Sequence, residues 1–159
     1  MKNNKEEKTN AIRLLEQKKF NFKIHDYSHS DVISGLDVAH YLGEDPDRVF
    51  KTLVTIGKSG NHYVFLVPVN AELDLKKAAQ AVGEKNISMI KSKELLPLTG
   101  YIHGGCSPIG MKKYFTTVID SSAGNYKEII FSAGKIGFQI EMDLTDLAEI
   151  ISFQLCEIT

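Results

Sequence analysis

Hydrophobic and polar residues follow one another along the chain in two rhythms. Apolar residues three or four positions apart predict amphipathic helices, and runs rich in β-branched and aromatic residues predict strands. The first rhythm predicts helices over residues 5–18, 34–43, 75–82 and 144–150, with shorter helical turns starting at 45 and over 93–96. The second predicts strands over residues 22–27, 49–57, 62–70, 87–90, 115–120, 127–134, 137–142 and 153–158.

Turn and cap residues support several of these boundaries. Asp74 and Gly83 bracket one helical run, in the positions where a side-chain cap begins a helix and a left-handed residue ends it. The sequence KSGN at 58–61 contains a glycine turn, so the strands on either side are predicted to form a hairpin. The turn over 93–96 should stop before Pro97, because proline disfavours helical backbone in the residue ahead of it.

The order of the predicted elements indicates the fold class. Strands and helices do not alternate in a regular βαβ rhythm, and the sequence has no internal repeat. This irregular order favours an α+β fold with a mixed, curved or barrel-like sheet surrounded by helices. A chain of 159 residues is short enough to share one core, so we predict a single domain over residues 1–159.

Composition narrows the class of protein further. Hydrophobic residues make up 43% of the chain and charged residues 25%, as in soluble globular proteins. The N-terminus lacks the apolar segment of a secretory signal, and no apolar run is long enough to span a membrane, so we expect a cytoplasmic protein without a membrane partner. Residues 71–115 carry seven lysines and four acids, whereas residues 116–159 carry two lysines and seven acids. This uneven distribution is compatible with a local basic face.

The glycine-rich stretch GGCSPIG at 104–110 lies between predicted elements. Gly104 and Gly105 permit close approach of a ligand to the main chain, and Ser107 offers a hydroxyl beside a proline. Consecutive amides in such a loop can bind an oxyanion, a phosphate or a carboxylate. An ordinary connection with several turns is the alternative interpretation.

Two cysteines, Cys106 and Cys156, stand far apart, so neither a zinc knuckle nor a disulfide framework is indicated. Nearby cations or an imidazole would activate the Cys106 thiol as a nucleophile, and His103, Lys112 and Lys113 are close in sequence. Free cysteines are more often buried packing residues. Packing is therefore the favoured interpretation, and a Cys106-dependent acyl transferase or hydrolase is the competing hypothesis.

Lys51 alternates with hydrophobic neighbours in VFKTLV at 49–54, so its ammonium group faces either solvent or a pocket. Propensity alone favours solvent. A lysine inside a pocket would instead hold a phosphate or a developing oxyanion. Thr52 is expected on the opposite face of the strand unless a bulge or the strand end redirects it.

The histidines and paired lysines add little independent evidence. His25 and His29 have a spacing that would bring them together on a helix, but their segment is predicted as strand and turn. We therefore expect no metal and no other cofactor. The lysine pairs at 76–77 and 112–113 could contact nucleic-acid backbone, although such pairs are more often solvated surface.

Five motifs are spread through most of the chain. They are HDY at 25–27, FKTLV at 50–54, LDLKKAA at 73–79, GYIHGGCSPIGMKK at 100–113 and SAGKIGFQIE at 132–141. Together, and in this order, they resemble the motifs of the YbaK/EbsC family. The resemblance implies a mixed α/β editing-domain fold with a curved central sheet, related to the insertion domain of bacterial prolyl-tRNA synthetases. It also implies trans-editing of mischarged aminoacyl-tRNA, with that synthetase as a possible partner.

The resemblance assigns roles to individual residues. It implies that Lys51 is the catalytic residue, which anchors the acylated 3′ end and stabilises developing charge. It implies that the substrate-binding residues are Tyr27, Thr52, Gly104, Gly105, Ser107, Ser132 and Gln139. Gln139 and Ile136 stand where the cysteine-specific branch of the family has aspartate and arginine.

The cysteine-specific branch implies a substrate-assisted reaction on Cys-tRNA(Pro). The thiol of the attached cysteine attacks its own ester carbonyl and releases tRNA and a thiolactone, so the protein needs no nucleophile. An internal thiol near the ester has a high effective molarity, which makes this route chemically sensible. Hydrolysis of alanyl-tRNA or another small aminoacyl-tRNA is the nearest alternative, and a non-catalytic regulatory module that binds tRNA or nucleotides is a third.

Overall fold

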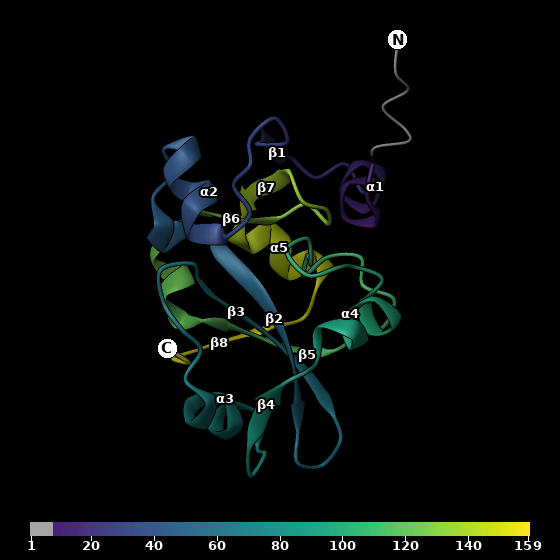
Figure 1. The fold of residues 1–159 in the computed structure, drawn as a ribbon, viewed down its shortest axis with the longest axis vertical. Helices are drawn as coiled ribbons and strands as arrows, with labels where there is room; N and C mark the ends of the chain where they lie inside the picture. The colour runs from purple at the N-terminus through teal and green to yellow at the C-terminus, as the bar shows by residue number, and fades with distance from the viewer. Residues whose placement is uncertain (1–7) are drawn as a thin grey trace.

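The strands assemble into two sheets that meet at the middle of the molecule (Figure 1). The computed structural model describes residues 8–159. The smaller sheet is antiparallel, in the order β1 (Lys23–Asp26), β7 (Phe138–Asp143) and β6 (Glu128–Ser132). The larger sheet has the order β4 (Ile87–Met89), β2 (Phe50–Gly57), β3 (His62–Pro68), β5 (Thr116–Asp120) and β8 (Gln154–Cys156).

The larger sheet is mixed, as the irregular order of elements predicts. Strand β2 runs antiparallel to β3 and β4, and β5 runs parallel to β3 and β8. The predicted hairpin forms between β2 and β3, with Gly60 at φ 93° in its turn. The prediction of an α+β fold with a mixed sheet is confirmed. In residues 8–159 the strands form two sheets rather than one, and they do not close into a barrel.

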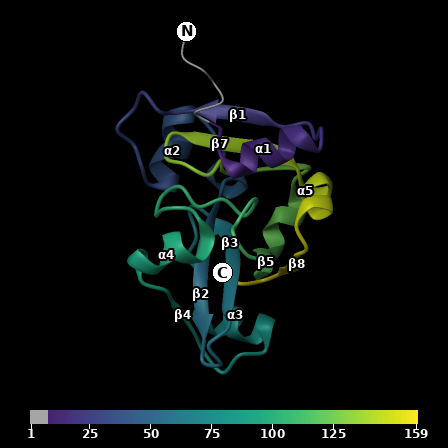
Figure 2. The same cartoon turned by 90° about the vertical axis from the view of Figure 1, so that its right-hand side faces the viewer.

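Five α-helices and two short 3₁₀ segments surround the sheets in the described part of the chain (Figure 2). The helices are α1 (Asn10–Gln17), α2 (Gly35–Leu42), α3 (Leu75–Val82), α4 (Ser92–Thr99) and α5 (Leu144–Ile150), and the 3₁₀ segments are η2 (Pro46–Arg48) and η3 (Ser121–Asn125). Asp74 caps α3 by accepting bonds from two main-chain N–H groups, and Gly83 ends the helix at φ 74°. Residues 5–7 of the first predicted helix lie outside the described residues. None of the described helices is long and apolar enough to cross a membrane.

The prediction for the segment before Pro97 is wrong. Helix α4 continues through Pro97 to Thr99, although proline interrupts the helical hydrogen bonds. Lys93, whose carbonyl loses its helical partner at Pro97, is exposed, so water can hydrate that carbonyl. The Thr99 hydroxyl bonds to the Leu95 carbonyl at 2.8 Å, and the Gly100 N–H bonds to that of Leu96 at 2.9 Å. These bonds hold the last turn together.

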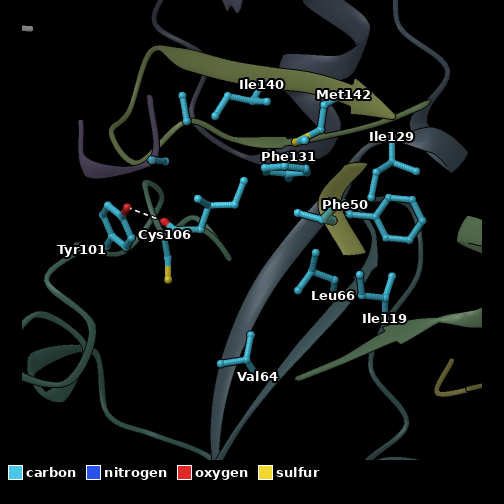
Figure 3. Close-up of a cluster of buried hydrophobic side chains, with 14 of the residues drawn as sticks. Phe50, Val64, Leu66, Tyr101, Cys106, Ile119, Ile129, Phe131, Ile140 and Met142 are labelled. Atoms are coloured by element: carbon cyan, nitrogen blue, oxygen red, sulfur yellow. Dashed lines mark hydrogen bonds between the residues drawn. The ribbon is translucent and has the colours of Figure 1, made fainter. Parts of the chain in front are cut away.

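A shared core packs between the two sheets. Phe131, Ile140 and Met142 of the smaller sheet face Phe50 and Leu66 of the larger one, and all five are at most 2% exposed (Figure 3). A parallel bridge between Val49 and Ile130 joins the sheets at the start of β2. This bridge fixes where the open edge of β2 begins.

Candidate functional site

A cavity of about 520 Å³ lies along the open edge of β2. At one end of this edge Val49 bridges to Ile130, and at the other the Ile90 N–H bonds to the Val54 carbonyl at 3.4 Å. Strand β4 pairs with β2 only from Thr55 onward, so the intervening residues pair with β3 alone. The cavity fills this gap, and its volume is within the range of ligand pockets.

The open edge explains how neighbouring residues reach one cavity. Lys51 and Thr52 lie on opposite faces of a regular strand without a bulge, yet both line the space. Carbonyl directions alternate along a strand, and the Val54 carbonyl points toward this edge. The main-chain N–H and C=O of Thr52 therefore point into the gap. The Thr52 hydroxyl is buried and has no hydrogen-bond partner among the described residues.

Lys51 supplies a cation with little local competition. Its Nζ lies 3.5 Å from Oε2 of Glu72, and the side chains are 29% and 92% exposed, respectively. An ion pair with so exposed a carboxylate is weak, because water screens the charges. The Lys51 ammonium group is thus available to an anionic group that enters the cavity.

Gln139 occupies the cavity wall from strand β7 and is only 5% exposed. With its amide oriented to satisfy both ends, the nitrogen donates to the two carboxylate oxygens of Glu44 at 2.7 and 3.2 Å. Burial raises the pKa of Glu44 above its ordinary value. Glu44 does not line the cavity itself, so it acts by fixing the orientation of the Gln139 amide.

A buried ion-pair network lies next to Glu44. Glu141 accepts a bond from Arg48 at 2.7 Å, and its other oxygen lies 2.7 Å from His25 Nε2. Burial alone would raise the pKa of Glu141, but the bonds and charges of Arg48 and His25 bring that pKa down to about 2. His25 is also paired in register with Gln139 across β1 and β7. The network holds together the strands that position Gln139.

Three other predicted residues line the same cavity, namely Tyr27, Gly104 and Ser132. Gly104 adopts φ 86°, which favours glycine, and a side chain there would contact Ile33 and Ile136. The Ser132 hydroxyl accepts a bond from the Gly134 N–H at 3.1 Å, which leaves its own proton available. The structure thus brings together six of the eight predicted residues.

Gly105 and Ser107 do not line the cavity. A Cβ at Gly105 would lie 2.9 Å from the Lys135 Cα, so glycine is required there by close packing against main chain. Ser107 is fully buried and accepts a bond from the Ile109 N–H at 3.3 Å. Both residues shape the loop that carries Gly104.

Cys106 lines the cavity but is only 7% exposed. Burial raises the pKa of its thiol to about 12. His103 also lines the cavity, yet the pKa of the thiol is shifted by burial and by a hydrogen bond with Thr99, and not by His103. A buried thiol held in its neutral form is a poor nucleophile.

Sequence reasoning missed Glu44 and Arg48. Each comes from the α2–η2 region and acts on β7, more than ninety residues away in sequence, so no local pattern signals the contact. His25 was weighed as a metal ligand and is instead an ion-pair partner. Within residues 8–159 no group of three or more His, Cys, Asp or Glu side chains is arranged to hold a metal ion.

The chain is similar to proteins of known sequence and structure. The chain is 46% identical to the "Putative Cys-tRNA(Pro)/Cys-tRNA(Cys) deacylase EbsC" of Enterococcus faecalis, over 97% of this chain and 94% of that protein. It is 30% identical to a proline–tRNA ligase of Pelobacter propionicus, over 66% of this chain but 18% of that enzyme.

A solved structure and a family model extend these matches. A crystal structure described as "a putative trans-editing enzyme for prolyl tRNA synthetase" superposes with a TM-score of 0.82 and 25% identity, covering 94% of this chain and 96% of that one. The model of the aminoacyl-tRNA editing domain matches residues 29–150. The chain therefore belongs to the aminoacyl-tRNA editing domain family.

Proposed function

We propose that this protein deacylates mischarged aminoacyl-tRNA in trans, with Cys-tRNA(Pro) as its main substrate. The proposal rests on the position of Lys51 in the cavity of a chain that belongs to an aminoacyl-tRNA editing family. The EbsC relative is named for Cys-tRNA(Pro) and Cys-tRNA(Cys). Its near full-length match supports the same substrate class for this chain.

The substrate would enter with its acylated ribose against the open edge of β2. Lys51 is placed to attract the anionic 3′ end of tRNA and to stabilise negative charge on the ester oxygen. The Thr52 N–H, which points into the same gap, is a second donor for that oxygen. Gly104 leaves room for the ligand to approach the opposite wall.

The chemistry proposed for cysteine needs no protein nucleophile. The substrate thiol attacks its own ester carbonyl, a C–S bond forms and the C–O bond to the ribose breaks. The thiol proton ends on the ribose oxygen, so the products are tRNA and a thiolactone. The protein holds the thiol near the ester, which gives the thiol a high effective molarity, and it stabilises the oxyanion. Both contributions accelerate the reaction.

The residues of the cavity favour this route over catalysis by Cys106. The buried thiol has a pKa of about 12, so it is almost wholly neutral at physiological pH. In contrast, Lys51 and the Thr52 main chain have few competing partners among the described residues. Prolyl-tRNA synthetase is a proposed partner that would present the tRNA, because its own sequences share this domain.

The decisive measurement is the release of tRNA from Cys-, Ala- and Pro-charged tRNA(Pro) by the purified protein. Selective loss of cysteine, with a thiolactone trapped by a nucleophile, is the expected result. Faster loss of alanine would assign the cavity to water-mediated hydrolysis. A folded protein that binds all three without releasing any acyl group would refute the deacylase and favour the binding module.

A further inference from the structure

Two segments of opposite charge form the rims of the cavity. Residues 27–47 carry five acids and neither lysine nor arginine: Asp31, Asp37, Glu44, Asp45 and Asp47. Residues 91–113 carry four lysines and one acid: Lys91, Lys93, Lys112, Lys113 and Glu94. Each segment contributes residues to the cavity lining.

The lysines of the second rim are free of acidic partners. All four are exposed, and none forms an ion pair with a carboxylate in the described part of the chain. The single acid, Glu94, accepts a bond from the main-chain N–H of Lys91 at 2.9 Å. Its carboxylate is thus engaged at the start of α4. The four ammonium groups remain as a surface of positive charge.

The two pairs of lysines lie at opposite ends of helix α4. Lys91 and Lys93 stand at the start of α4, whereas the side chain of Lys112 packs at the other end beside Gly100. The Lys112 N–H also bonds to the Thr99 carbonyl at 3.0 Å, which fixes the loop on the end of the helix. An eight-residue helix spans roughly 12 Å, a length that covers two or three phosphate positions of a nucleic-acid strand.

Exposed apolar side chains accompany this charge. Tyr114 is 70% exposed and Ile102 is 50% exposed, and both belong to the loop that follows α4. Unpaired bases at the end of an RNA stack on exposed aromatic side chains such as Tyr114, and lysines contact the phosphates that follow. The acidic rim, residues 27–47, has no lysine or arginine to contact these phosphates, and its carboxylates would repel them.

We infer that the acceptor stem of a bound tRNA extends from the cavity across α4 and the loop that follows it, and that its phosphates dock on this rim and not on the α2 rim. The inference rests on the proposed function, since it assumes that a charged 3′ end occupies the cavity. Beyond that function, it specifies the path of the tRNA from the cavity and the lysines outside the cavity that bind its phosphates.

The test compares two double charge reversals. Lys112→Glu with Lys113→Glu changes the rim, and Lys58→Glu with Lys85→Glu is the matched control. The control lysines are also exposed and without an acidic partner among residues 8–159, and they lie beside each other, since the Lys58 N–H bonds to the Asn86 carbonyl at 3.2 Å. Neither control residue lines the cavity.

The rim variant should raise the KM for charged tRNA about tenfold and flatten its salt dependence, because about two phosphate contacts are lost. Turnover of a small substrate, aminoacyl-adenosine, should be unchanged. The control variant should change the KM by less than twofold. Equal weakening by both variants, or by neither, would overturn the docking surface.

Binding of uncharged tRNA separates this inference from the proposed function. If the wild-type protein deacylates nothing, the function fails, but the rim variant must still weaken tRNA binding about tenfold relative to the control. If the wild type deacylates and the rim variant binds tRNA normally, the function stands and the docking surface is wrong. Thermal unfolding of all variants checks that each remains folded.

Discussion

Strands β2 and β7 both present polar side chains to the cavity, but they hold them in opposite ways. Lys51 on β2 has one partner, the highly exposed Glu72, at 3.5 Å. Gln139 on β7 is buried and held by both oxygens of Glu44, next to an ion-pair network. We interpret β2 as the strand that supplies a positive charge to the substrate, and β7 as the strand that supplies a rigid wall of the cavity.

The difference has a physical origin in the two sheets. Strand β2 has an open edge beside the cavity, so its side chains and main chain meet few partners there. Strand β7 is the central strand of the smaller sheet, with β1 and β6 on its two sides. Gln139 and Glu141 on this strand are buried, and burial requires each of them to be hydrogen-bonded.

The largest effect is expected at the β2 side. Lys51→Ala should lower kcat/KM for Cys-tRNA(Pro) by about 10²- to 10³-fold, because the main positive charge at the ester is lost. Stability should change little, since the ion pair it breaks is exposed. Single-turnover deacylation measures the effect, with Lys58→Ala in the hairpin turn as control. If Lys51→Ala keeps full activity, the charge that stabilises the reaction lies elsewhere.

The next effect is expected in the network behind β7. Glu141→Gln should lower the free energy of unfolding by about 2 kcal/mol, because Arg48 loses its buried partner. The Arg48 side chain is 27% exposed, so water recovers part of the loss. Urea denaturation at neutral pH measures the change. A variant as stable as the wild type would show that the network positions residues without stabilising the fold.

The same variant has a defined pH dependence. Glu141 has a pKa of about 2 in the folded protein, below its ordinary value of 4.5. Its contribution to stability is therefore complete above about pH 4.5 and is lost as the pH falls toward 2. The difference in stability between wild type and Glu141→Gln should shrink across this range. A difference that stays constant down to pH 2 would assign the acid sensitivity to other carboxyl groups.

A smaller effect is expected at Glu44. Glu44→Ala should lower kcat about tenfold, because the Gln139 amide loses the acceptor that fixes its orientation. Glu44→Gln retains an acceptor oxygen and should restore most of the rate. Comparison of kcat for both variants separates positioning from charge. Equal loss in the two variants would mean that the carboxylate charge, and not the hydrogen bond, is what matters.

Particular residues show what the sequence could and could not predict. Periodicity and caps located α3 between Asp74 and Gly83, because these signals are local. The family motifs selected Lys51 and Gln139, which do share one cavity. Glu44 carried no signal, since its partner is distant in the chain and its loop has no periodicity.

The glycine-rich loop divides in the same way. Sequence alone could not separate Gly104 from Gly105, because both are glycines in one loop. Only the packing of Gly105 against the Lys135 main chain shows that one glycine lines the cavity and the other supports it. The open edge of β2 could not be predicted from the sequence either, because it depends on the residue at which β4 begins to pair with β2.

The smallest effect is expected at Cys106, which lines the cavity beside these polar groups. Cys106→Ser should keep activity within about twofold, because a thiol with a pKa of about 12 is neutral at physiological pH and attacks no ester. Native protein should also resist iodoacetamide, since the residue is 7% exposed. Loss of turnover in Cys106→Ser, with Lys51→Ala still active, would transfer catalysis from the substrate thiol to the protein thiol. The comparison of β2 with β7 would then describe substrate binding and no longer the reaction.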